Sequence, residues 1–345
     1  MKALVYHGGG RIAWQEHPKP SLRNAGDAIV RMLKTTICGT DLHIVRGDVP
    51  TCTPGRVLGH EGVGVVESVG AGVTMLRPDE HVLISGISSC GKCGYCQRGL
   101  VAHCPTGGWK LGNTIDGTQA EYVRIPHAQN SLYPIPAGAG EAAIVALGDI
   151  LPTGFECGLL NGKVAPGSSV AIVGGGSIAL AALLAARLYA PAKIIVIDVD
   201  GDRLAMALRL GATYTLDSAR GDTVARVLAL TAGRGVDTAI EAVGVPATLR
   251  LCHDIVARRG EVVGIGVHGQ AVPEQLEALW SQTIAITSRL IDRVSTPMLL
   301  KRVVAAIVEP LSPPPRRFKF QHMLEAYDTV RRAADTGAPR VIIET

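Results

Sequence analysis

The stretch Ser169-Val170-Ala171-Ile172-Val173-Gly174-Gly175-Gly176-Ser177-Ile178-Ala179 decides the fold of this chain. Five residues typical of a buried strand lead into three glycines, and a helical pattern follows. This arrangement, G-x-G-x-x-A, predicts a dinucleotide-binding turn, although a glycine trio also occurs in ordinary turns. Gly174 would make the tight turn, and Gly176 would let backbone N–H groups approach a pyrophosphate. Ser177 and Ile178 begin the helix and are predicted to contact the same cofactor.

The next predicted strand, Lys193–Asp198, ends in an acid about 20 residues after the glycines. A carboxylate there bonds the ribose 2′-OH of a dinucleotide and repels a 2′-phosphate, so Asp198 predicts NAD rather than NADP. Two alternatives stay open. Asp198 could cap the next helix instead, and Arg203 could either contact the adenosine ribose or face solvent.

Strands and helices alternate throughout residues 151–290, which predicts a Rossmann-type, doubly wound parallel sheet. The expected elements are strands at Val170–Val173, Lys193–Asp198, Val236–Glu241 and Glu261–Val267, and helices at Ile178–Tyr189, Arg203–Leu210 and Ala247–Ile255. Residues 1–150 have short apolar runs broken by Gly, Pro and Asp, which is typical of a β-rich domain. Residues 291–345 return to mixed elements, with a helix expected at Met323–Ala334 and a strand at Arg340–Glu344. We therefore expect an α/β protein of two domains.

Composition excludes several classes of function. The 345 residues are 47% hydrophobic and 19% charged, which is enough apolar material for two cores and argues against disorder. A net charge of +4 and 4% aromatics do not support nucleic-acid binding. With no long apolar run and no apparent signal peptide, we expect a cytoplasmic protein without membrane contacts.

Four of the eight cysteines are clustered as Cys90, Cys93, Cys96 and Cys104. The spacing C-x2-C-x2-C-x7-C allows four thiolates to surround one zinc ion tetrahedrally, which leaves no position for water. Such a zinc would be structural. An iron–sulfur cluster is the alternative, because the first two spacings, C-x2-C-x2-C, also occur in ferredoxins, although the x7 spacing fits less well. A disulfide framework is a weaker alternative.

Three further segments, far apart in the chain, contain side chains that could bind a metal ion or transfer a proton. They are Cys38-Gly39-Thr40-Asp41-Leu42-His43, Gly59-His60-Glu61 and Gly148-Asp149. A catalytic zinc uses about three protein ligands and keeps one position open, and mixed Cys, His and carboxylate sets are common. Taken singly, each signal is weak, because a lone cysteine is usually a small core residue and a lone histidine is more often a core or surface residue than a ligand.

Together with the four-cysteine loop and the nucleotide-binding pattern, these motifs resemble the zinc-dependent medium-chain alcohol dehydrogenases. Gly59-His60-Glu61-Gly62-Val63-Gly64-Val65-Val66 is close to a signature of that family, and the resemblance extends over the whole chain. It implies a GroES-like catalytic domain at 1–150 and 291–345, a Rossmann NAD-binding domain at 151–290, and a homotetramer. It also implies that Cys38, His60 and Asp149 hold the catalytic zinc, with Glu61 as a conditional ligand.

The resemblance also assigns roles outside the metal ligands. Thr40 and His43 would relay a proton from the substrate hydroxyl to solvent. Trp109 would line the substrate pocket with Thr40, as in the bacterial secondary-alcohol dehydrogenases, and Asp149 resembles the same subgroup. The residues implied to contact the nicotinamide half or the pyrophosphate of the cofactor are Thr153, Val243, Val267, Ser288, Leu290 and Arg340.

The function expected from the sequence is hydride transfer between NAD and a small alcohol, ketone or aldehyde, with secondary alcohols preferred. Threonine, polyol and glutathione-independent formaldehyde dehydrogenases are alternatives within the same superfamily, although Asp149 and Trp109 argue against the first two. A non-catalytic nucleotide-binding protein is the alternative from another class. It would require a broken ligand or relay set, and all of those residues are present.

Overall fold

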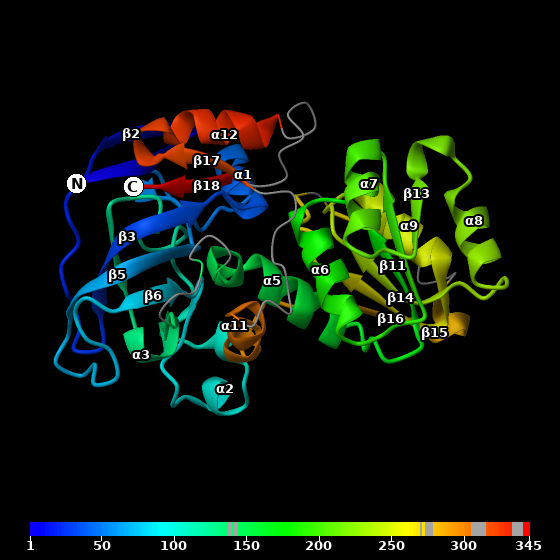
Figure 1. The fold of residues 1–345 in the computed structure, drawn as a ribbon, viewed down its shortest axis with the longest axis horizontal. Helices are drawn as coiled ribbons and strands as arrows, with labels where there is room; N and C mark the ends of the chain where they lie inside the picture. The colour runs from blue at the N-terminus through cyan, green and yellow to red at the C-terminus, as the bar shows by residue number, and fades with distance from the viewer. Residues whose placement is uncertain (137–139, 141–143, 270, 273–278, 305–314, 333–340) are drawn as a thin grey trace. The chain divides into compact units, whose positions relative to one another are not determined.

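The computed structural model describes residues 1–136, 140, 144–269, 271–272, 279–304, 315–332 and 341–345. The chain divides into two compact units, which Figure 1 shows with their helices and strands labelled. The first unit comprises Met1–Asp149 and Asp292–Thr345, and the second comprises Ile150–Ile291. Arg340, the predicted pyrophosphate ligand, lies outside the described residues.

Antiparallel strands build most of the first unit. Its largest sheet has the order β10-β6-β5-β3-β18-β17, with β9 paired to β3, and a smaller sheet has the order β2-β1-β4. The strands are β1 (Lys2–Gly8), β2 (Arg11–Glu16), β3 (Ala28–Thr36), β4 (Arg56–Val57), β5 (Gly62–Val69), β6 (His81–Ile84), β7 (Ile87–Ser88), β8 (Gly108–Trp109), β9 (Tyr122–Ile125), β10 (Leu132–Pro134), β17 (Arg316–Lys319) and β18 (Val341–Glu344). The helices are α1 (Gly39–Arg46), α2 (Gly94–Gln97), η1 (Val101–His103), α3 (Ala128–Ser131), η2 (Val145–Gly148), α11 (Thr296–Val304), η6 (Phe320–His322) and α12 (Met323–Arg331).

Alternation along the strands creates the core of this unit. Ala28, Val30 and Met32 lie on one face of β3 because side chains two residues apart in a strand share a face. They belong to one buried cluster with Ile343 of β18 and Tyr327 of α12. The C-terminal segments therefore complete the core that the N-terminal strands begin.

The second unit contains the predicted parallel sheet, with the order β13-β12-β11-β14-β15-β16. Its elements are α5 (Ile150–Thr153), the π-helix η3 (Gly154–Leu160), β11 (Ser169–Val173), α6 (Ser177–Arg187), β12 (Lys193–Asp198), α7 (Gly201–Arg209), β13 (Tyr214–Asp217), η4 (Ser218–Arg220), α8 (Thr223–Leu230), β14 (Val236–Glu241), α9 (Pro246–Ile255), β15 (Val256–Gly264), η5 (Trp280–Gln282) and β16 (Ala285–Ser288). The α/β prediction is confirmed. The sequence pattern predicted none of β13, α8 and β16, and the predicted strand at Glu261–Val267 begins later than β15 does.

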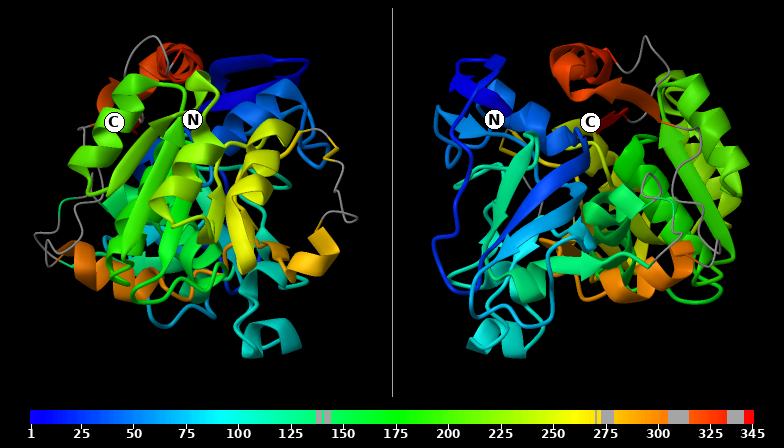
Figure 2. Two further views of the ribbon diagram at one scale, coloured as in Figure 1. Left: turned by 90° about the vertical axis from the view of Figure 1, so that its right-hand side faces the viewer. Right: turned by 60° about the vertical axis from the view of Figure 1, so that its left-hand side comes forward.

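Helices cover both faces of this sheet, as the turned views in Figure 2 help to show. Ala171 and Val173 of β11 face a core that includes Val227 of α8 and Leu249 of α9. The intervening residues Val170 and Ile172 are also fully buried, on the opposite face, and α6 follows β11 directly. A strand buried on both faces is what the continuous apolar run at 169–173 indicates.

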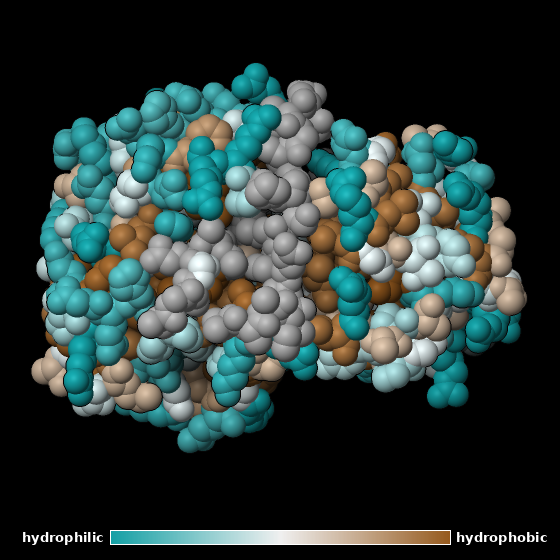
Figure 3. Space-filling model, viewed as in Figure 1, coloured by the Kyte–Doolittle hydropathy of each residue, from teal (hydrophilic) through white to brown (hydrophobic). Residues whose placement is uncertain are grey.

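Hydrophilic side chains cover much of the outer surface of the first unit in the view of Figure 3. The whole chain contains 34 Lys and Arg residues and 30 Asp and Glu residues. Among the helices that the structure describes, none combines the length and the apolar character needed to cross a lipid bilayer.

Candidate metal centres and cofactor site

Four potential metal ligands from three distant segments meet in the first unit. They are Cys38, His60, Glu61 and Asp149, and one ligand atom of each lies within 4.8 Å of those of the others. His60 Nε2 and Asp149 Oδ2 are 3.9 Å apart. Ligands at about 2.0–2.3 Å from a tetrahedral ion are separated by about 3.3–3.8 Å, so this spacing is close to that of a metal site.

Local backbone structure presents these side chains. Cys38 is the N-cap residue of α1, and Asp149 directly follows η2. Gly59, which precedes His60, has a φ of 92°, and a Cβ there would lie 2.6 Å from the Gln119 side chain. Only glycine fits both restrictions, so Gly59 fixes the backbone from which the His60 side chain points into the site.

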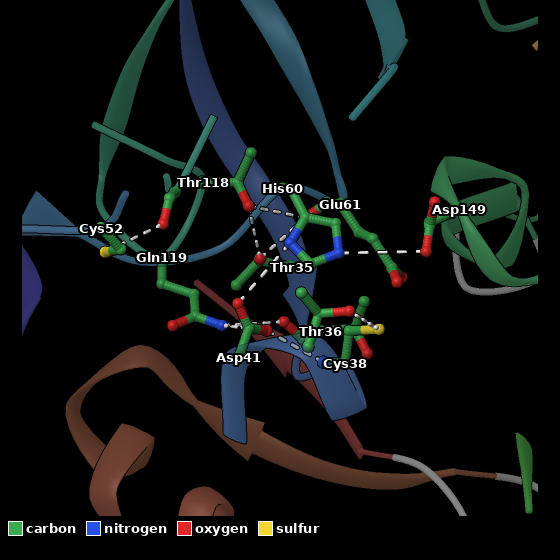
Figure 4. A network of polar contacts seen from close by, with 12 residues as sticks. Thr35, Thr36, Cys38, Asp41, Cys52, His60, Glu61, Thr118, Gln119 and Asp149 are labelled. Atoms are coloured by element: carbon green, nitrogen blue, oxygen red, sulfur yellow. Dashed lines mark hydrogen bonds and ion pairs between the residues drawn. The ribbon is translucent and has the colours of Figure 1, made fainter. Parts of the chain in front are cut away.

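Asp41 organises the site from behind, and Figure 4 shows it on the opposite side of His60 from Asp149. Its Oδ1 lies 3.6 Å from His60 Nδ1, and its Oδ2 accepts hydrogen bonds from the Cys38 N–H (2.9 Å) and from Gln119 Nε2 (3.1 Å). A carboxylate behind a ligating histidine fixes the ring and its tautomer. No role for Asp41 is among the expectations from the sequence. Its place three residues after the N-cap cysteine was a usable signal, whereas nothing in the sequence identifies Gln119.

The donor set is rich in acids, and its His60 and Glu61 are buried while Cys38 and Asp149 are partly exposed. Asp41 and Glu61 are each 1% exposed, and His60 is 4% exposed. Burial raises the pKa of the Cys38 thiol. Burial alone would lower the pKa of His60, but the nearby Asp41 carboxylate raises that pKa well above its ordinary value. A divalent cation would replace these protons and offset the like charges, so the residues fit a metal ion.

The four clustered cysteines also converge, with their sulfurs within 4.8 Å of one another. Cys93 Sγ lies 3.4 Å from Cys96 Sγ, and Cys90 Sγ lies 3.9 Å from Cys96 Sγ. Four thiolates around one zinc ion stand about 3.8 Å apart, whereas a multi-iron cluster would separate them further. The geometry therefore favours a single zinc over the iron–sulfur alternative.

Two cysteines of this cluster have pKa values shifted in opposite directions, which favours a bound metal ion. Backbone N–H groups of Lys92 and Cys93 lower the pKa of Cys90 to about 6. Burial and the neighbouring Cys93 raise the pKa of Cys96 to about 12. Adjacent thiols that cannot all ionise alone would do so around a cation, and a bound zinc deprotonates its cysteine ligands.

Of the remaining residues predicted for catalysis, Thr40 lies beside Cys38 and Trp109 lies beside His60, whereas His43 shares only helix α1 with Thr40. Thr40 Oγ1 lies 3.7 Å from Cys38 Sγ. His43, one helical turn further along α1, has its Nδ1 at 2.8 Å from Asp48 Oδ2. The Trp109 ring meets the His60 ring edge to face, with centroids 6.0 Å apart. The structure therefore brings Trp109 to the metal ligands.

The glycine turn lies in the second unit, between β11 and α6. Gly174 has a φ of 115°, and a Cβ at that position would lie 2.9 Å from the Val243 side chain. A Cβ at Gly176, by contrast, would meet no protein atom within 4 Å. This open space at the N-terminus of α6, beside Ser177 and Ile178, fits a pyrophosphate.

Asp198 ends β12 and is only 8% exposed. Its carboxylate accepts hydrogen bonds from the N–H groups of Gly175 (2.5 Å) and Asp200 (2.9 Å). Asp200, not Asp198, caps α7, so the alternative role for Asp198 is wrong. Arg203 Nη1 stands 3.9 Å from Asp198 Oδ2 and is half-exposed.

The residues predicted to contact the nicotinamide gather near the carboxyl ends of β14, β15 and β16. Val243 follows β14, Val267 follows β15, Ser288 ends β16, and Leu290 lies two residues beyond. The three apolar side chains among them are each at least 40% exposed. Thr153 ends α5, elsewhere in the same unit. In doubly wound sheets, ligands bind at the carboxyl ends of the strands.

Comparisons with known proteins agree with this geometry. Residues 24–137 match the family model of the alcohol dehydrogenase GroES-like domain, and residues 177–305 match that of zinc-binding dehydrogenases. The chain is 38% identical over 294 residues to an alcohol dehydrogenase of Cupriavidus necator, covering 81% of this chain and 80% of that protein.

Solved structures extend the comparison to the whole fold. Zinc dependent alcohol dehydrogenase 2 from Streptococcus pneumonia has 48% identity and a TM-score of 0.96, over 100% of this chain and 98% of that one. A zinc-binding dehydrogenase from Sinorhizobium meliloti, solved with NADP bound, has 27% identity and a TM-score of 0.87, over 100% and 99%.

The fold and the two clusters define a zinc-dependent oxidoreductase that uses a nicotinamide cofactor. The chain belongs to the zinc-type medium-chain alcohol dehydrogenase family.

Proposed function

We propose that this alcohol dehydrogenase oxidises small secondary alcohols with NAD, at a metal held by Cys38, His60 and Asp149. The observation that carries the proposal is the convergence of these side chains, with Glu61, from three remote segments onto one point. Cys90, Cys93, Cys96 and Cys104 would hold a second, structural zinc.

When bound, a zinc ion held by Cys38, His60 and Asp149 would supply a Lewis acid for the alcohol oxygen, and a nicotinamide cofactor would supply the hydride acceptor. The Thr40 hydroxyl, 3.7 Å from the Cys38 sulfur, accepts the substrate proton as it releases its own, because a hydroxyl both donates and accepts. His43 then passes this proton towards solvent, with its ring oriented by Asp48.

Two side chains support the finer assignments. Trp109 places a broad apolar ring beside His60, which suits an alcohol with a carbon on each side of the hydroxyl. Asp198 favours NAD, because a carboxylate at the end of β12 repels a 2′-phosphate. A homotetramer is proposed from the family resemblance, and a cytoplasmic location from a sequence in which no long apolar run occurs.

The decisive experiment is a panel of 2-propanol, 2-butanol, ethanol, formaldehyde, threonine and sorbitol, followed by NADH absorbance. We expect the highest kcat/KM for the secondary alcohols, and loss of turnover with a zinc chelator. A preference for threonine, sorbitol or formaldehyde would replace the substrate assignment.

Paired cysteine variants test the site itself. Cys38→Ala should abolish turnover, while Cys252→Ala, which removes a buried thiol outside both clusters, should retain it. Wild-type turnover by Cys38→Ala would refute the ligand assignment.

A further inference from the structure

Glu241, the last residue of β14, is a buried acid outside the metal sites. It is 0% exposed, yet its Oε1 accepts hydrogen bonds from the N–H groups of Val243 and Gly244, both at 2.9 Å. The same oxygen accepts a 2.6 Å hydrogen bond from the hydroxyl of Thr248 on α9. The other oxygen, Oε2, lies 3.2 Å from His268 Nε2. The carboxylate therefore fixes the turn that leaves β14.

Glu241 also holds the neighbouring loop, which leaves β15. Its backbone carbonyl accepts hydrogen bonds from the N–H groups of Ile265 (2.9 Å) and Gly266 (3.2 Å). A Cβ at Gly266 would lie 2.6 Å from Oε2, and one at Gly244 would collide with the Val267 carbonyl. The two loops are thus packed on each other around one acidic residue.

These two loops lie at the part of the sheet where the second half of a dinucleotide belongs. Strand order reverses between β11 and β14, and a dinucleotide crosses a doubly wound sheet at such a point. The glycine turn and Asp198 lie at the carboxyl ends of β11 and β12, where the adenosine half and the pyrophosphate would bind. The carboxyl ends of β14 and β15 then remain for the nicotinamide half. Val243 and Val267, 44% and 40% exposed, carry apolar surface there.

We propose that Glu241 is a positioning residue for the nicotinamide half of the cofactor, acting through the loops that carry Val243 and Val267. The inference rests on the proposed NAD site. Burying a carboxylate is costly unless hydrogen bonds compensate. Here three donors converge on one of its oxygens, and hydrogen bonds to a charged acceptor are stronger than those to a neutral one. The result is a rigid pair of loops before the cofactor arrives, which reduces the entropy lost on binding.

The test compares two ligands on the zinc-loaded protein, by fluorescence titration with NADH and by calorimetry with ADP-ribose, which lacks nicotinamide. Glu241→Leu removes the acceptor and should weaken NADH binding by about tenfold or more, while ADP-ribose affinity changes by less than about twofold. Glu241→Gln keeps an acceptor oxygen and should restore most of the NADH affinity. The melting temperature of each variant is measured alongside.

Asp237 provides a matched control because it is a second acid on β14, at the opposite end of the strand. Its Oδ2 accepts hydrogen bonds from the N–H and the hydroxyl of Ser169, both at 2.7 Å. Asp237→Leu should leave both affinities unchanged. If Glu241→Leu does not fold, Thr248→Val removes one donor from the same oxygen and should lower NADH affinity to a smaller extent.

The outcomes separate this inference from the proposed function. Equal losses for NADH and ADP-ribose, or no loss for either, would overturn the role of Glu241 in the nicotinamide half. Failure of the wild-type protein to bind ADP-ribose or NADH would instead refute the cofactor site itself.

Discussion

At the scale of single residues, the catalytic site depends on how each ligand is oriented. Cys38 and His60 are both held by Asp41, whose two oxygens face the backbone of the first and the ring of the second. Asp198 similarly binds the backbone of the glycine turn. Each of these carboxylates therefore fixes a backbone segment. Asp41 also places negative charge beside the His60 ring, and Asp198 places it where the ribose of the cofactor would bind.

Asp41→Asn should weaken zinc binding in the catalytic site about 10- to 100-fold, as is usual when the partner of a ligating histidine is removed. Zinc retention during titration with a chelator measures this. Asp48→Asn is the control, because Asp48 pairs with His43 and no metal ligand. Equal zinc retention by Asp41→Asn and the wild type would remove the orienting role of Asp41.

Asp198→Ala should lower the ratio of kcat/KM for NAD over NADP by about tenfold or more, since it removes both the ribose acceptor and the repulsion of a 2′-phosphate. The ratio is obtained from initial rates with each cofactor. Asp200→Ala, which removes the cap of α7 two residues away, should leave it close to the wild-type value. An unchanged ratio in Asp198→Ala would exclude the cofactor role of Asp198.

At the scale of elements, residues 90–104 have little core of their own. α2 and η1 are single short turns, and α2 contains no buried residue. Sulfur contacts among the four cysteines tie these turns together. A metal that closes such a loop contributes directly to folding.

Cys93→Ser should therefore release one zinc per chain and lower the melting temperature by at least about 5 °C, with the catalytic zinc retained. Elemental analysis and calorimetry measure both effects. Cys52→Ala removes a thiol outside the clusters and serves as the control. Full zinc content in Cys93→Ser would contradict a structural site at these cysteines.

Asp237, near the start of β14, makes a contribution to the free energy of unfolding that depends on pH. Burial opposes ionisation of this acid, but hydrogen bonds from Ser169 together with the charge of Arg234 lower its pKa below the ordinary 3.8. A lowered pKa stabilises the folded state above about pH 4, and the stabilisation is lost as the pH falls through the folded value. Asp237→Asn should thus be less stable than the wild type at pH 6, with the gap closing towards pH 3.

Urea denaturation midpoints at each pH measure the difference. Asp254→Asn, a change to an exposed acid paired with Arg250 four residues away, should give a smaller difference at every pH. A constant gap between Asp237→Asn and the wild type from pH 6 to pH 3 would contradict the assignment.

At the scale of the whole molecule, local patterns predicted most of the fold. The apolar run at 169–173 and the glycines after it predicted the position of β11 and the start of α6. Burial on both faces of a strand requires a continuous apolar run, and a positive φ favours glycine. β13 and α8 were missed because they are short and carry mixed polarity. β15 begins earlier than its apolar run because Val256 pairs with Val236.

The ligands of the proposed catalytic site required more than local pattern. Spacing alone predicted the four-cysteine cluster, because its members lie within one short segment, residues 90–104. Cys38, His60 and Asp149 were assigned by family resemblance, since no local signal shows that distant segments meet. Gln119 and Glu241 could not be foreseen, because their roles come from tertiary hydrogen bonds.

The central claim is that three remote side chains hold one zinc ion that is separate from the four-cysteine zinc. Anomalous scattering at the zinc edge, from crystals of the purified enzyme, tests it most directly. We predict two peaks per chain, one among the four clustered cysteines and one bonded to Cys38, His60 and Asp149. A single peak at the cysteines, or a second peak away from these three side chains, would contradict the account.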